Sequence, residues 1–82
     1  MNQNYESLQI TDLCLATTIS LWHSPVNVYK SKNKAVFVFP SNQETNDLIN
    51  LFWENKIQVE PKQFFSQLKN LKTRIYSLSS SP

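Results

Sequence analysis

Few residues of this chain could carry catalytic or metal chemistry: one cysteine (Cys14), one histidine (His23), and the acidic pair Glu44 and Asp47. A structural zinc site needs several converging thiolate or imidazole ligands, which one Cys and one His cannot supply. Glu44 and Asp47 are spaced like paired carboxylates, but they open a predicted helix, where negative charge complements the helix dipole. We expect no metal, no cofactor and no catalytic residues, and therefore a protein that is not an enzyme.

Glycine is absent from the sequence. Walker phosphate loops and the dinucleotide fingerprint both depend on glycine, so neither is present. A serine hydrolase is not expected, because no strained elbow and no glycine-rich oxyanion loop accompany the serines. His23 is interpreted as a helix-end residue beside terminal carbonyls, and Cys14 as a small buried hydrophobic residue.

Lysines and aromatic rings are more informative, because they could meet phosphates and stack on bases. Lys30, Lys32 and Lys34 follow Tyr29 in a segment that is predicted to form the tip of a hairpin. The same pattern also fits a solvated loop whose charges block edge-to-edge aggregation. Both interpretations stand on the sequence alone.

A second basic group lies in the predicted last helix. Phe65, Lys69, Lys72 and Tyr76 recur there at i, i+4, i+7 and i+11, beside the apolar stripe of the helix. This flank could contact a partner, although lysine stems also cover the margins of apolar faces. A location of both lysine groups on one side of the fold would strengthen a nucleic-acid hypothesis.

Two functional hypotheses follow. The leading one is a small non-enzymatic module that contacts nucleic acid through the hairpin lysines and the basic flank of the last helix. The alternative is a protein interaction module, a homodimer or a subunit of a larger assembly, that uses exposed rings such as Trp22, Trp53 and Phe65. Five Phe, three Tyr and two Trp are many for a core of this size, and a ring left outside would mark a protein contact.

Charge and hydropathy limit the functional classes. Eight Lys and Arg against six Asp and Glu give a net charge of +2, well below the excess of a dedicated nucleic-acid binder. The N-terminus has no signal-peptide pattern, and the longest apolar run, residues 35–39, is too short to span a bilayer. We expect a cytoplasmic protein without a membrane partner.

Apolar spacing and turn residues predict the elements that position these side chains. A helix is expected over residues 12–22, capped by Thr11 or Asp12, with Thr17, Thr18 and Ser20 on its polar side. Residues 26–30 and 34–39 are predicted to form a β-hairpin in which Asn33 adopts positive φ and the second strand is central.

Ser41 and Glu44 predict a capping box at the start of the next helix, which ends near Asn55. Residues 57–59 form a link or a third strand, and Pro61 then opens the last helix.

The domain organisation follows from these elements. Residues 1–10 are predicted to be an N-terminal extended segment, residues 11–76 a single domain, and residues 77–82 a disordered tail. The fold class is α+β: a helix, a β-hairpin and two helices packed on one small antiparallel sheet. A chain of 82 residues has no room for a second domain.

Three groups of residues carry a resemblance that covers about residues 10–76. They are Thr11-Asp12-Leu13 with Leu15-Ala16; the strand Val36-Phe37-Val38-Phe39; and Val59-Glu60-Pro61 followed by Phe64-Phe65, Leu68 and Leu71-Lys72. On these positions the chain resembles a family of short, uncharacterised bacterial and phage domains of unknown function. It departs from that family at His23-Ser24-Pro25, where similar sequences often have glycine. The resemblance implies a fold and a prokaryotic or phage setting, and it brings no activity.

Overall fold

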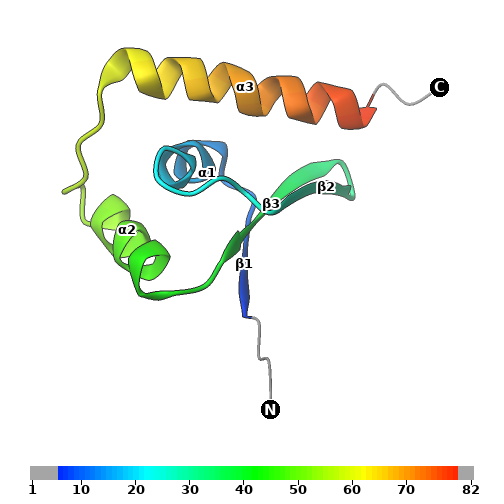
Figure 1. The fold of residues 1–82 in the computed structure, drawn as a ribbon. Helices are drawn as coiled ribbons and strands as arrows, with labels where there is room; N and C mark the ends of the chain where they lie inside the picture. Colours follow the sequence, from blue (N-terminus) through cyan, green and yellow to red (C-terminus); the bar gives the residue numbers. More distant parts are fainter. Residues whose placement is uncertain (1–5, 80–82) are drawn as a thin grey trace.

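The computed structural model describes residues 6–79. Along the chain the elements are β1 (Ser7–Ile10), α1 (Leu13–Ser20), β2 (Asn27–Ser31), β3 (Lys34–Pro40), α2 (Gln43–Trp53) and α3 (Pro61–Ser79). The predicted α+β class is confirmed, with the hairpin and the two helices that follow it. Figure 1 shows α1 in the middle of the molecule, between the sheet, α2 and α3.

The sheet has three antiparallel strands in the order β1-β3-β2, so the predicted central position of β3 is confirmed. Ile10 of β1 and Val28 of β2 both lie opposite Phe37 of β3. The third strand is β1, within the segment predicted only to be extended. Residues 54–60, all of which the structure describes, form the predicted link and no strand.

One face of the sheet packs against the helices. Phe37 and Phe39 are almost fully buried on that face, whereas Val36 and Val38 alternate to the other face. The core combines the helix-facing side chains of the strands with apolar side chains of all three helices: Ile10, Leu15, Ala16, Ile19, Val28, Phe37, Phe39, Leu48 and Leu71.

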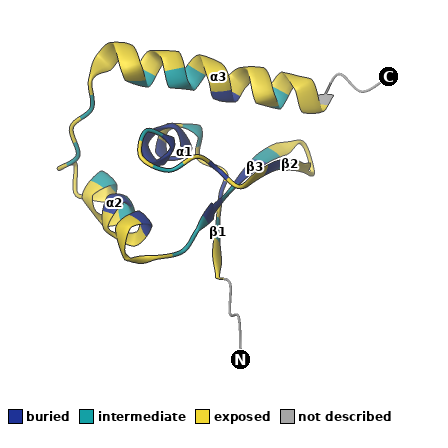
Figure 2. Cartoon of the chain, in the orientation of Figure 1, coloured by how far each residue is buried: buried dark blue, intermediate teal, exposed yellow. Residues whose placement is uncertain are grey.

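α1 is buried on nearly every side, so the prediction that Thr17, Thr18 and Ser20 form a polar face is wrong. Residues 15–20 are all buried, as the dark helix at the centre of Figure 2 shows. These hydroxyl groups can be buried because they form hydrogen bonds to backbone carbonyls of the same helix. Thr17 Oγ1 donates to the Leu13 carbonyl at 2.7 Å, and Thr18 and Ser20 donate to carbonyls of the preceding turn in the same way.

The first turn of α1 contains one confirmed prediction and one correction. Asp12 caps the helix, since its side chain accepts from the Leu15 amide at 3.0 Å. Cys14 was predicted to be buried, but it is exposed. It precedes the buried stretch that begins at Leu15, so its side chain faces solvent rather than α2 or α3.

The capping box of α2 lies one residue later than predicted. Asn42, not Ser41, is the cap: its Oδ1 accepts from the Thr45 amide at 2.9 Å, and the Asn42 amide donates to Thr45 Oγ1 at 3.0 Å. Glu44 therefore has no part in the box. Ser41 instead contacts the residue that precedes β1: its amide donates to the Glu6 carbonyl at 3.1 Å.

α2 ends at Trp53, and Asn55 has the predicted left-handed conformation just beyond it, with a φ of 60°. The Lys56 amide donates to the Leu51 carbonyl at 2.9 Å, and the Asn55 amide donates to the Phe52 carbonyl at 3.1 Å. These two bonds define a Schellman motif, in which a left-handed residue lets the chain fold back over the last carbonyls.

α3 opens at Pro61 as predicted, and Glu60 Oε1 accepts from the Gln63 amide at 2.8 Å. The helix continues to Ser79, so residues 77–79 are helical and not part of a disordered tail. Leu78 follows Ile75 by three residues and extends the apolar side by one step. Residues 80–82 lie outside the described chain, and no helix within residues 6–79 is long and apolar enough to cross a membrane.

Candidate functional site

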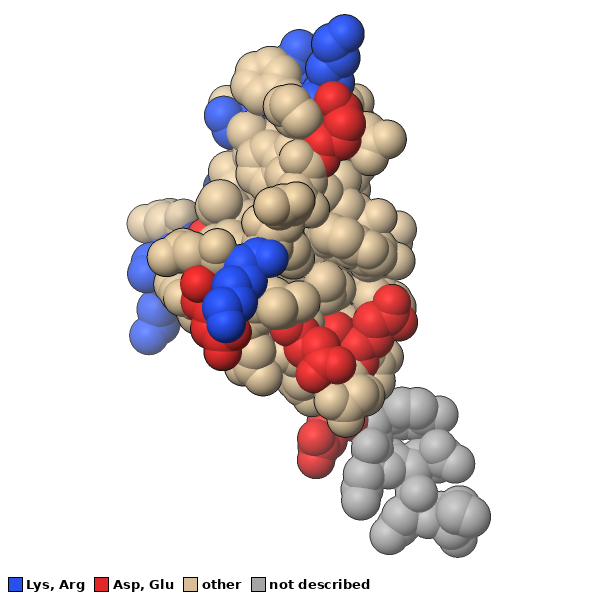
Figure 3. All heavy atoms as spheres, turned by 90° about the vertical axis from the view of Figure 1, so that its left-hand side faces the viewer, with Lys and Arg blue, Asp and Glu red and all other residues tan. Residues whose placement is uncertain are grey.

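Positive charge is concentrated in two elements. Seven of the eight basic side chains belong to the hairpin, residues 27–40, or to α3: Lys30, Lys32, Lys34, Lys62, Lys69, Lys72 and Arg74. Neither element contains an Asp or Glu, and α3 packs directly against β2. In Figure 3 some basic side chains lie at the top, over α3, next to an acidic one, and others lie at mid-height, whereas most acidic side chains lie over the lower half of that face. The hairpin and α3 therefore form one basic end of the molecule.

The hairpin turn is tighter than a three-residue loop. Ser31 pairs with Lys34, which leaves only Lys32 and Asn33 in the turn, with φ values of 53° and 72°. The positive φ predicted for Asn33 is confirmed, and Lys32 shares it. Two consecutive positive φ values are the signature of a type I′ turn, whose twist matches that of the strands.

The strand register distributes the predicted hairpin residues over both faces. Lys30 lies opposite Ala35 on the helix-facing side, whereas Lys34 is one residue out of phase and points to the other side. Lys32 occupies the tip between them. Tyr29 lies opposite Val36, on the same face as Lys34, and is half-buried. The lysines surround the tip rather than forming a flat patch.

The predicted flank of α3 is present as one exposed stripe. The exposed fractions of Phe65 and Tyr76 are 56% and 70%, and Lys69 and Lys72 lie between them in the sequence and are also exposed. Lys69 Nζ lies 5.0 Å from the centroid of the Phe65 ring, a cation–π contact. Leu71, which is 1% exposed, marks the opposite, packed side of the helix.

The two lysine groups belong to elements that pack against each other, but they point in different directions. The packed side of α3 rests on α1 and β2, so the flank of Phe65 and Tyr76 faces away from the sheet. Lys30 lies on the sheet face that α3 covers, and Lys34 lies on the opposite face. The groups adjoin at one end of the molecule and present their charges in different directions.

The tryptophans that were singled out as contact residues are both substantially exposed. The exposed fractions are 47% for Trp22 and 63% for Trp53. Trp53 meets Phe52 edge to face, with centroids 5.0 Å apart and ring planes at 88°. Trp22, just beyond α1, lines an open hollow of ≈ 240 Å³ with residues 58–60 of the link.

His23 has a side-chain partner that the sequence did not reveal. Its Nε2 lies 2.9 Å from Glu44 Oε1 at the start of α2, an ion pair when the imidazole is protonated. The His23 backbone amide donates to the Ile19 carbonyl at 2.9 Å, so His23 lies beside a helix-end carbonyl as predicted, while its side chain pairs with Glu44. The pair joins the end of α1 to the start of α2.

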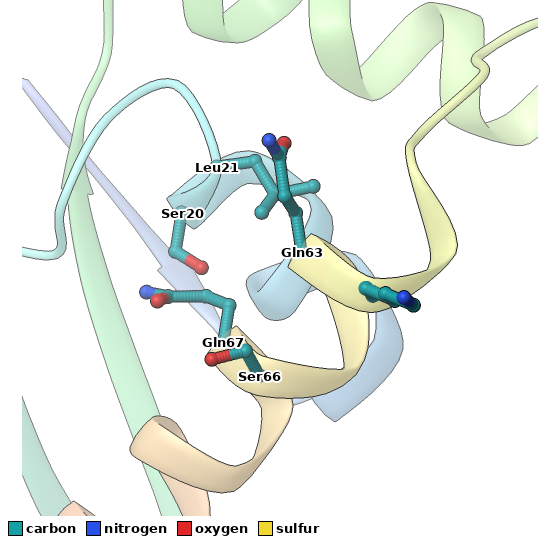
Figure 4. A pocket seen from close by; sticks show the side chains of 6 residues that line it. Ser20, Leu21, Gln63, Ser66 and Gln67 are labelled. Atoms are coloured by element: carbon teal, nitrogen blue, oxygen red, sulfur yellow. The ribbon is translucent and has the colours of Figure 1, made fainter.

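Two shallow hollows flank the beginning of α3. The larger, ≈ 400 Å³, lies between α1 and α3 and is lined by one apolar residue, Leu21, and five polar ones: Ser20, Lys62, Gln63, Ser66 and Gln67. In Figure 4 the α1 residues face Gln63 and Gln67 across it. The other, ≈ 330 Å³, is bounded by Pro61, Phe65 and Lys69 and shares Lys62 and Ser66 with the first. Among residues 6–79 no group of three His, Cys, Asp or Glu could hold a metal ion.

Comparison with known protein families identifies a match. Residues 8–77 match a family described as a domain of unknown function, DUF5659. The chain belongs to the DUF5659 family. The resemblance to a family of unknown function is thereby confirmed. No curated protein and no solved structure matches the chain.

The DUF5659 match begins inside β1 and ends inside α3, so the family unit includes the strand that precedes α1. Every candidate binding residue lies within the match, from Trp22 to Tyr76. The two glutamines across the larger hollow lie within it as well. Sequence reasoning missed these glutamines, although their i, i+4 spacing on a helix was a signal that they share a face.

Proposed function

We propose that the protein is a small non-enzymatic module that binds nucleic acid through the hairpin lysines and the basic flank of α3. The observation that supports this most is the separation of charge: seven of eight cationic side chains belong to the hairpin and α3, and all six acids lie elsewhere. Phosphate contacts supply most of the affinity in such complexes, and elements without acidic residues of their own approach phosphates with little repulsion. A cytoplasmic location is part of the same proposal.

The hairpin tip supports the proposal by its shape. Lys32 and Lys34 extend from a narrow two-residue turn, and Tyr29 lies on the same face as Lys34. A narrow, charged tip can enter a groove or follow a backbone, and a neighbouring ring can lie against a sugar or base.

The test measures binding of the full chain to labelled single-stranded and duplex DNA and RNA by fluorescence anisotropy at several salt concentrations. Log affinity falls as log salt concentration rises, and each lysine that neutralises a duplex phosphate makes this negative slope steeper by about 0.9. The double variant Lys69→Gln with Lys72→Gln should therefore bind more weakly and with a shallower slope.

Lys56→Gln is the matched control, because Lys56 is exposed and lies outside both the hairpin and α3. It should leave affinity and slope nearly unchanged. Absence of binding at low salt to every nucleic acid would contradict the proposal. An equal loss of affinity in the control would contradict the assignment of the site.

A protein interaction module is the second candidate, and the exposure of Trp22 and Trp53 favours it. Exposed tryptophans are frequent hot spots of protein interfaces. Light scattering should then give a mass above the 9.6 kDa monomer that falls on substitution of these rings by Ala. A monomeric mass at all concentrations would contradict the homodimer form of this candidate.

A further inference from the structure

The outer flank of α3 combines charge with flat apolar surface. Phe65 and Tyr76 leave more than half of their surface in water, and Lys69 and Lys72 lie between them on the same side. Rings of this size normally help to fill the core of a small domain, so two of them on one exposed helix face call for an explanation. We infer that this flank is a stacking platform for single-stranded nucleic acid, an inference that rests on the proposed function above.

The charge on α3 identifies a polyanion as the occupant. The helix carries Lys62, Lys69, Lys72 and Arg74 and no acid over its 19 residues. An acidic protein partner could satisfy the lysines, but exposed flat rings beside the lysines match the combination of phosphate and base in a nucleotide chain. Aromatic stacking tolerates any base sequence, because every base has a π-face.

The spacing of the rings favours a single strand over a duplex. Eleven residues at about 1.5 Å per residue place Phe65 and Tyr76 roughly 16 Å apart along the axis. Bases paired inside a duplex follow one another at about 3.4 Å and keep their faces covered, so neither ring can reach a base face without unstacking. A single strand can be extended between the rings, with its phosphates near Lys69 and Lys72.

The contact between Lys69 and Phe65 fixes the geometry at the first stacking position. The ammonium lies over the ring, 5.0 Å from its centroid, so it covers one face of Phe65, and a base stacks on the other face or displaces the ammonium. The open hollow of ≈ 330 Å³ beside this ring is bounded by both residues together with Pro61, Lys62 and Ser66. A base stacked at Phe65 therefore has an open hollow next to the ring, and two lysines line that hollow.

The experiment compares anisotropy titrations of labelled oligo(dT), oligo(rU) and a mixed-sequence duplex of equal length with the full chain. The variants Phe65→Leu and Tyr76→Leu each remove a ring and keep every charge. Each should weaken single-strand binding between about fivefold and a hundredfold and leave the salt slope unchanged. Trp53→Leu removes an exposed ring on α2 and should have no such effect. Circular dichroism of each variant confirms that the fold is retained.

The outcomes separate this inference from the proposal beneath it. Preference for the single strands, lost with either ring, supports the platform. Salt-sensitive binding that is equal for single strands and duplex, or that is unaffected by ring removal, overturns the platform and leaves nucleic-acid binding in place. Failure of the protein to bind any of the probes at low salt overturns both.

Discussion

The hydroxyl of Thr45 donates to the carbonyl of Pro40 across 2.7 Å, from a side chain that has no exposed surface. The same oxygen accepts from the Asn42 amide at 3.0 Å. One threonine thus joins the end of β3 to the first turn of α2. Because a hydroxyl both donates and accepts, no apolar residue of the same shape can replace it.

Thr45→Val should destabilise the domain by about 2 kcal/mol. The substitution preserves shape but leaves a carbonyl and an amide without this partner at a buried junction. Urea unfolding followed by circular dichroism measures the change in free energy of unfolding. Thr73→Val is the control, because Thr73 is exposed on α3 and should cost at most about 0.5 kcal/mol. Equal losses in the two variants would contradict the role of Thr45.

Thr17→Val should change the free energy of unfolding by less than about 1 kcal/mol, although Thr17 is as buried as Thr45. Its hydroxyl donates to the Leu13 carbonyl, which still accepts from the backbone amide one helical turn later. No buried backbone group loses its sole partner, and the added methyl is apolar. A loss matching that of Thr45→Val in the same urea titration would show that the Thr17 hydroxyl has a further role.

Asn55→Gly should stabilise the protein by up to about 1 kcal/mol, and Asn55→Val should destabilise it. The residue has a φ of 60°, a conformation that costs little for glycine and most for a β-branched side chain. Thermal unfolding of the two variants should therefore give shifts in opposite directions. Shifts of the same sign would indicate that the asparagine side chain, not the backbone, governs this helix end.

Lys32→Asn should raise the stability of the protein and lower its affinity for nucleic acid. Asparagine tolerates the left-handed conformation of this turn better than lysine, so the melting temperature should rise. The same change removes a cation from the hairpin tip, so affinity for nucleic acid should fall. Differential scanning calorimetry and anisotropy on one preparation test both effects. A variant that is more stable and binds with unchanged affinity would remove Lys32 from the proposed interface.

Leu71→Ala should cost about 2–5 kcal/mol, because Leu71 is the one buried side chain among residues 61–78 of α3. Hydrogen exchange should show that α3 amides lose protection before those of α1. Leu78→Ala, at a position that is 38% exposed, should cost about 1 kcal/mol or less. Simultaneous loss of protection in both helices would show that α3 unfolds only with the rest.

Local signals predicted most of the fold. Asp12, Asn33, Asn55 and Pro61 each occupy the cap, turn or helix-start position expected of them, because these preferences depend on a few neighbouring atoms. The hairpin followed from apolar strands on either side of a short polar turn. β1 was harder to recognise, since four residues carry too little pattern to indicate pairing with a strand almost thirty positions later.

The error at α1 arose because tertiary packing overrides the local pattern. In the sequence, Thr17 and Thr18 suggest a solvent-exposed face. In the structure they are buried, because the sheet, α2 and α3 surround α1. The candidate site was likewise predicted where it depends on local helical spacing and missed where it depends on strand pairing. Phe65 and Tyr76 were expected together on one helical flank and lie there, whereas the opposite directions of Lys30 and Lys34 depend on a register that the sequence did not specify.

The uneven distribution of charge also gives the molecule a dipole moment, which its net charge of +2 does not reveal. A dipole rotates in the field of a charged surface before contact is made. The protein should therefore approach a polyanion with the hairpin and α3 facing it, which raises the share of encounters that have the orientation needed for binding.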